Sequence, residues 1–175
     1  MKHLFTRLIL TLSLALAGAL PAFAAGMSNY LENKVGDYIF RAQAWTQPTT
    51  LCVGLATASI ADTTTGATVT EAAYTGYARG QLNASYSAWK GTGDEVTNTG
   101  SAGTDGTISN ASAITIGSAA SSGPTVVTHF FLADSCTAGA GNILFYGALG
   151  TSKTINNGDP APSFAIDSAT FQMDN

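Results

Sequence analysis

Charged side chains are scarce in this sequence of 175 residues, in which Asp, Glu, Lys and Arg together make up 10% of the chain. An average soluble domain carries about 25%. Only seven residues are Lys or Arg, and they do not cluster. A nucleic-acid-binding surface needs clustered basic side chains to displace counterions from phosphates, and attraction to an anionic membrane needs them as well. The sequence therefore argues against both kinds of partner.

Histidine is rarer still, which limits the catalytic chemistry open to the chain. His129 is the only histidine after residue 3, and on a strand Asp134 would point to the opposite face from it. There is no GxSxG nucleophile motif. The eleven acidic residues show no spacing typical of a glycosidase pair or of a calcium cage. We therefore predict no catalytic, cofactor-binding or metal-binding residues, and a protein that is not an enzyme.

Only two cysteines occur, Cys52 and Cys136, and they do not form a CxxC motif. No histidine cluster accompanies them, so a zinc site is not expected. In an oxidising compartment they could pair and close a long loop, to which the chain-entropy model assigns roughly 4–5 kcal/mol as an upper bound. Two unpaired thiols are the alternative, and the sequence leaves both open.

Long hydrophobic runs are also lacking, apart from one at the start of the chain. Basic Lys2 and Arg7 precede an apolar run over residues 8–20, and Pro21 follows it. As a helix this run would rise about 20 Å, which is too short to cross a hydrocarbon core of about 30 Å. Small residues around Ala24 complete the pattern of a secretory signal peptide. We predict a signal peptide over 1–24 with cleavage after Ala24, and a single soluble domain over 25–175.

One helix is predicted near the start of that domain, over about residues 29–46. Asn29 is an expected N-cap, and Glu32 stands where a capping-box partner belongs. Pro48 ends the element. The apolar residues at helical spacing are Leu31, Val35, Ile39 and Ala42.

Glycine, serine and threonine are abundant from residue 49 onward, and there the pattern changes to short β runs. Residues 50–56 alternate as a half-buried strand does, and 125–134 with 142–150 predict a hairpin joined through 137–141. Residues 91–106 predict an exposed loop. The remaining expected strands are 67–74, 77–89 (one long or two short), 107–116 and 163–173. This spacing indicates an antiparallel β-sandwich or jelly-roll-like domain with one N-terminal helix.

Aromatic residues outside the most apolar runs are the most suggestive candidates for recognition. They would form a contact surface for a sugar or a protein, and the alternative is that they cap the core beneath loops. These candidates are Trp45, Trp89, Tyr74, Tyr77 and Tyr86.

From Met27 onward the sequence resembles a family of small virion proteins of tailed bacteriophages, usually labelled phage tail fibre protein. The pieces that carry the resemblance are SNYLENKVGDYIFR (28–41), TLCVGLATAS (50–59), YAR (77–79), ISNASAITI (108–116), VTHFFLAD (127–134) and GNILFYGALGTSKTINNGDPAPSF (141–164). The resemblance implies a non-enzymatic structural subunit that assembles with itself, as a homo-oligomer or fibre, or with other virion proteins. It implies no catalytic residues.

These observations lead to two hypotheses for the function. The first is a phage-like structural assembly subunit, located in the virion if translation starts at Met27. The alternative is an exported bacterial surface or fibre subunit, or a carbohydrate-binding β-sandwich that contacts a cell-surface glycan. The alternative places the protein outside the cell or at its surface, if the signal peptide is used.

Overall fold

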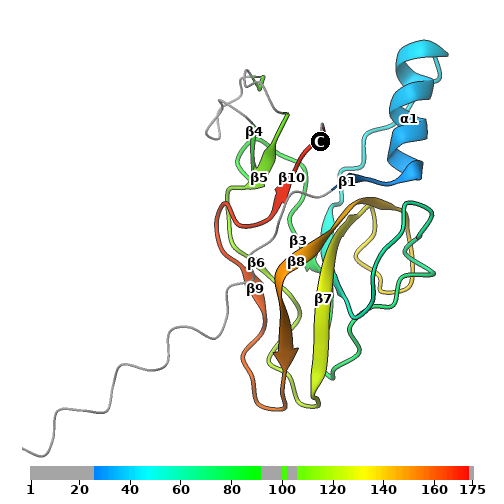
Figure 1. The fold of residues 1–175 in the computed structure, drawn as a ribbon. Helices are drawn as coiled ribbons and strands as arrows, with labels where there is room; N and C mark the ends of the chain where they lie inside the picture. Colours follow the sequence, from blue (N-terminus) through cyan, green and yellow to red (C-terminus); the bar gives the residue numbers. More distant parts are fainter. Residues whose placement is uncertain (1–25, 92–99, 102–105, 174–175) are drawn as a thin grey trace, which may run out of the picture.

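The computed structural model describes residues 26–91, 100–101 and 106–173 (Figure 1). The predicted signal peptide over 1–24, its cleavage after Ala24 and most of the loop expected at 91–106 lie outside the described residues. The described chain is mainly β, with antiparallel sheets and one helix. The predicted fold class is confirmed.

The largest sheet has five strands in the order β1-β8-β7-β2-β3, and all its pairs are antiparallel. The expected hairpin is present, but its connection runs over 134–142 and β8 continues beyond residue 150. Residues 151–154 are mostly exposed and polar, so they gave no apolar signal although they pair with the start of β7. The strands are β1 (Gly26–Met27), β2 (Cys52–Ala56), β3 (Gly80–Gln81), β7 (Thr125–Ala133) and β8 (Ile143–Ile155).

β2 was expected to be half-buried, and this was wrong, because all five of its residues are buried. One face of the strand packs into the main core. The opposite face lies under the segment 57–72, from which Ile60 joins a second buried cluster with Phe131 of β7 and Val69 packs against that cluster. Gly54 carries no side chain because the Phe131 ring occupies the place where a Cβ would stand.

Two small sheets form the second layer of the sandwich. One has three strands in the order β10-β5-β4, and the other pairs β6 with β9. Phe130 of β7 lies between the layers, with ring centroids 5.7 Å from Phe164 and 5.9 Å from Phe171. Each such buried ring stabilises the fold by about 1.5–3 kcal/mol. The strands are β4 (Trp89–Gly91), β5 (Ile108–Asn110), β6 (Ile114–Thr115), β9 (Ser163–Phe164) and β10 (Thr170–Phe171).

The short strands correct several sequence-based expectations. Residues 67–74 form turns with a single bridge between Ala56 and Glu71. The runs 107–116 and 163–173 are each divided into two strands, and 77–89 supplies two short ones. In the last run the division coincides with Asp167, whose φ of 62° is incompatible with a continuous strand.

Helix α1 (Asn29–Phe40) projects from one end of the β layers (Figure 1). Its N-cap is Ser28 and not Asn29, since the Ser28 hydroxyl accepts the Leu31 N–H at 3.3 Å. The helix ends six residues before the expected position at 46. Ala42 takes a left-handed conformation, with φ 52°, and the chain then runs without regular structure so that Trp45 returns to the core.

Candidate functional site

The five aromatic residues singled out in the sequence do not share one surface. Tyr74 is 3% exposed and donates its hydroxyl to the Ile116 carbonyl at 3.3 Å. Burial raises its pKa to about 12. Tyr77 donates to the Glu71 carboxylate at 2.6 Å inside the fold. Tyr74 is thus an interior residue, and Tyr77 is half-buried with its hydroxyl bonded within the fold, which corrects the expectation that the two belong to a recognition surface.

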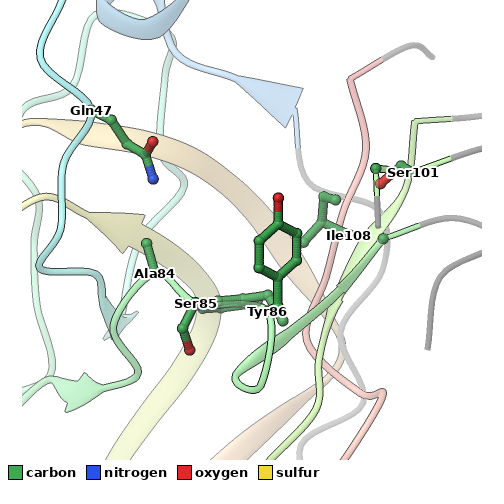
Figure 2. Close-up of a pocket in the computed structure, with 9 residues that line it drawn as sticks. Gln47, Ala84, Ser85, Tyr86, Ser101 and Ile108 are labelled. Carbon is green, nitrogen blue, oxygen red and sulfur yellow. The ribbon is translucent and has the colours of Figure 1, made fainter. Parts of the chain in front are cut away.

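Tyr86 and Trp89, in contrast, line a surface depression that we call the aromatic cleft. Its volume is about 660 Å³. In Figure 2 the Tyr86 ring stands within the cleft, and the Gln47 side chain extends toward it from another wall. The residues that line the cleft are Gln47, Ala84, Ser85, Tyr86, Trp89, Gly91, Gly100, Ser101 and Ile108.

A turn over residues 85–88 positions the two rings. The N–H groups of Ala88 and Trp89 both donate to the Ser85 carbonyl, at 3.1 Å each. This turn leaves Tyr86 at its tip, 52% exposed, and starts β4 at Trp89. The Trp89 indole N–H donates to the Leu82 carbonyl at 3.1 Å, and the ring packs edge-on against Phe171, with centroids 5.7 Å apart. The Trp89 ring is therefore held in one orientation.

The aromatic cleft continues into an apolar groove of about 220 Å³, and the two share Gln47, Ala84, Trp89 and Ile108. Trp45 lines the groove, so three of the five predicted aromatic residues lie in one continuous depression. None of the described residues that line either part is charged. The remaining residues that line the groove are Leu31, Val35, Pro48, Leu51, Leu132, Leu144, Phe145, Phe171 and Met173.

Among the described residues, the shortest ion pair lies in an internal network of Arg79, Glu71 and Tyr77. We call this network the Arg79 clamp. Arg79 is 5% exposed, and its Nη2 lies 2.5 Å from Glu71 Oε1. Its Nη1 also donates to the carbonyls of Ser135 and Ala140, at 2.7 and 2.9 Å. The guanidinium stacks over Phe131, 5.0 Å from the ring centroid. The clamp thus ties the 134–142 connection to the segment that covers β2.

Glu71 is ionised more readily than an ordinary glutamate. Burial by itself raises the pKa of its carboxyl. The hydrogen bonds from Arg79, from Tyr77 and from the Gly139 N–H together outweigh that effect, so the pKa lies below its ordinary value of 4.5. A fully satisfied network of this kind holds a structure rigid. No buried side-chain polar atom in the described part of the chain lacks a partner. Sequence reasoning missed this network, although YAR at 77–79 was noted as a motif.

The two cysteines meet at the same connection. Cys52 is fully buried and forms a disulfide with Cys136, with Cα atoms 5.2 Å apart. This separation lies within the usual range for a disulfide. The bond joins the first residue of β2 to the connection between β7 and β8, beside the carbonyls that Arg79 binds.

The groups considered for catalysis are placed as follows. His129 is half-buried on β7, and its Nδ1 lies 2.8 Å from the Thr128 hydroxyl. Burial lowers the pKa of its imidazole. Asp134 accepts hydrogen bonds from the Asn142 backbone and side chain, at 2.7 and 2.8 Å. Among the described residues, no group of three or more His, Cys, Asp or Glu is arranged to hold a metal ion.

A separate surface lies at the end of α1. Tyr38 and Ile39 are each 62% exposed and Phe40 is 85% exposed, and we call these three residues the exposed end of α1. Only Leu31 of the helix is fully buried. Within the described ranges, no helix is long and apolar enough to span a membrane.

Comparison with known proteins identifies the family to which the chain belongs. The search of curated proteins finds no match. The model of one family, described as podophage GP4 fiber I protein gp80, matches residues 26–172. That match covers nearly all of the described residues, and it confirms the resemblance to phage fibre proteins that the sequence indicates. The chain therefore belongs to the podophage GP4 fiber I protein gp80 family.

Proposed function

We propose that this protein is a non-enzymatic structural subunit of a phage fibre, and that it acts by assembling with further copies of itself in the virion. Family membership supports the structural fibre role. The observation that carries the assembly proposal is the exposed end of α1, where three consecutive large apolar side chains face solvent. Contiguous exposed apolar patches of this kind often mark sites of interaction with other molecules.

The size of this patch is compatible with an interface. An aromatic side chain buries about 150–250 Å², so the three residues together offer roughly 350 Å² of free surface. A stable interface buries about 800 Å² on each partner. The exposed residues 41–44, which follow the helix, are placed to supply part of the remainder. A second copy presents the same apolar side chains, whereas a soluble monomer gains nothing from exposing them.

The oligomeric state of the purified protein tests this proposal. Size-exclusion chromatography with light scattering is expected to give a discrete oligomer or a filament for the unmodified protein. The double variant I39S/F40S should dissociate to a monomer. Ile166→Ser is the matched control, because Ile166 is also an exposed isoleucine, at 55%, but lies far along the chain from α1. An unmodified protein that is monomeric at all concentrations would overturn the proposal.

An exported surface or fibre subunit is the second candidate, and the disulfide between Cys52 and Cys136 favours it. Disulfides persist in oxidising compartments and are rare in the cytosol. Intact mass and N-terminal sequence of protein from its native source, measured without reductant, separate the two candidates. A product that begins at Ala25 with the disulfide closed supports export, whereas one that begins at Met27 with free thiols supports assembly in the cytosol. Carbohydrate recognition, the remaining alternative, is supported by the exposed Tyr86 beside Trp89.

A further inference from the structure

We infer that the aromatic cleft binds a neutral oligosaccharide, a function that goes beyond assembly and does not depend on it. A sugar ring has an apolar face of C–H groups and a rim of hydroxyls. Its binding site therefore needs an accessible aromatic face with hydrogen-bonding groups around it. The cleft combines both, and it does so at residues that the fold has no need to expose.

The aromatic part of the site is Tyr86 and Trp89. Tyr86 is 52% exposed at the tip of its turn, so its ring is open to a ligand. The indole N–H of Trp89 is already engaged with the Leu82 carbonyl, so within the cleft the indole offers its carbon surface. Because Phe171 and the 85–88 turn hold the Trp89 ring in place, a ligand would not have to pay for ordering it.

The polar part of the site is the Gln47 amide with the serines of the cleft wall. Within the described part of the chain the Gln47 amide has no hydrogen-bond partner, and its side chain extends toward Tyr86 (Figure 2). An amide offers two donor hydrogens and one acceptor oxygen, which suits a pair of adjacent hydroxyls. Ser85 and Ser101 add hydroxyl groups to the lining.

The absence of charged side chains among the described residues of the lining favours one class of ligand. A phosphate, a carboxylate or a cation would be desolvated in the cleft without an opposite charge to compensate. Among the described residues, no Asp, Glu, Lys, Arg or His lines the cleft, so a neutral ligand is favoured. The volume of about 660 Å³ is within the usual range of small-molecule sites, roughly 300–1,000 Å³, and accommodates a short oligosaccharide.

Tryptophan fluorescence gives a readout specific to this depression, because the only two tryptophans, Trp45 and Trp89, both line it. The full-length mature protein is titrated with maltohexaose, cellohexaose, chitohexaose and a neutral bacterial O-polysaccharide freed of its lipid. At least one probe is expected to shift the emission in a saturable way. Trp45→Phe should retain that shift, which assigns it to Trp89.

Two variants and a control give the test its specificity. Tyr86→Ala is expected to weaken binding at least tenfold, and Gln47→Ala several-fold, with unchanged unfolding midpoints because both side chains are exposed. Ile166→Ala is the matched control, since Ile166 is exposed to a similar degree, 55% against 52% for Tyr86, but lines neither the cleft nor the groove, and this variant should bind as the unmodified protein does.

Three outcomes would overturn the inference. In the first, none of the four probes produces a saturable shift. In the second, Tyr86→Ala binds the probe as tightly as the unmodified protein does. In the third, the tryptophan emission changes with protein concentration but does not change when sugar is added. That result would mean that a second copy of the chain fills the depression. Loss of oligomers in I39S/F40S with retained sugar binding would separate this site from the assembly surface.

Discussion

The Arg79 clamp and the exposed end of α1 differ in which kind of side chain is buried and which is exposed. In the clamp, one guanidinium at 5% exposure contacts a carboxylate, a ring and the backbone of two further segments. At the end of α1, three apolar side chains that a fold would ordinarily bury stand in solvent. A charge is buried in one place, and a hydrophobic cluster is exposed in the other.

The difference separates what the domain needs for itself from what it offers to others. The clamp and the disulfide hold the irregular segments 57–79 and 134–142, which lack a ladder of strand hydrogen bonds, so they contribute to folding stability. The exposed end of α1 contributes almost nothing to the stability of a single copy. Changes in the clamp should therefore alter the free energy of unfolding, and changes on α1 should alter association.

The largest effect on stability is expected for Arg79→Met. This change leaves the Glu71 carboxylate buried without its partner and removes donors from the carbonyls of Ser135 and Ala140, so we expect a loss of about 3–5 kcal/mol. Urea unfolding measures it. Arg41→Met is the matched control, because the Arg41 ion pair with Asp37 is exposed and should contribute less than about 0.5 kcal/mol. Equal effects of the two substitutions would remove the distinction between the regions.

Removal of the disulfide should have the next largest effect. The double variant C52A/C136A is expected to lose about 2–4 kcal/mol, because the bond closes a loop between positions 84 residues apart. Chemical reduction of the unmodified protein should likewise lower the urea concentration at the midpoint of unfolding. A midpoint that reduction leaves unchanged would show that the clamp alone holds the 134–142 connection.

Acid should weaken the clamp in a defined range of pH. The pKa of Glu71 is lower in the folded protein than its ordinary value of 4.5, so its contribution to stability is fully present above pH 4.5 and is lost as the pH falls through the folded value. The free energy of unfolding should therefore decrease below pH 4.5. In Glu71→Gln, this part of the acid dependence should be absent. An unchanged slope in that variant would contradict the role assigned to the carboxylate.

The smallest effect on stability is expected at the exposed end of α1. Phe40→Ser should change the free energy of unfolding of a single copy by less than about 0.5 kcal/mol, because the side chain is 85% exposed. The same substitution should weaken self-association strongly. Unfolding at a concentration where the protein is monomeric isolates the first quantity. A large loss of stability there would show that Phe40 packs within its own chain.

Much of the fold was predictable from particular residues. The alternation and apolar runs around Val53, Phe130 and Leu144 placed the three long strands of the main sheet, and Leu31 with Val35 placed the helix. The limits of the elements were less predictable. The helix was expected to continue to about residue 46, because the apolar spacing continues, but packing of Trp45 on the core required the chain to turn at Ala42.

The candidate site was predictable only in part. Trp45, Trp89 and Tyr86 were singled out because aromatic residues outside the apolar strands often mark contact surfaces, and the structure places them in one depression. Tyr74 and Tyr77 had the same appearance in the sequence, but Tyr74 is buried and Tyr77 is half-buried against the core. Gln47 carried no signal at all, because an isolated glutamine in a loop looks the same whether or not it faces an aromatic ring.

The sequence by itself determined the class of this protein: few charges, short alternating runs and one helical stripe allow a β-rich domain and little else, because local periodicity decides which face of each element is apolar. Only the tertiary structure decided which side chains are brought together. Glu71 contacts Arg79, Cys52 pairs with Cys136, and Gln47 lines the same cleft as Tyr86. These arrangements depend on the packing of the whole core and not on local spacing.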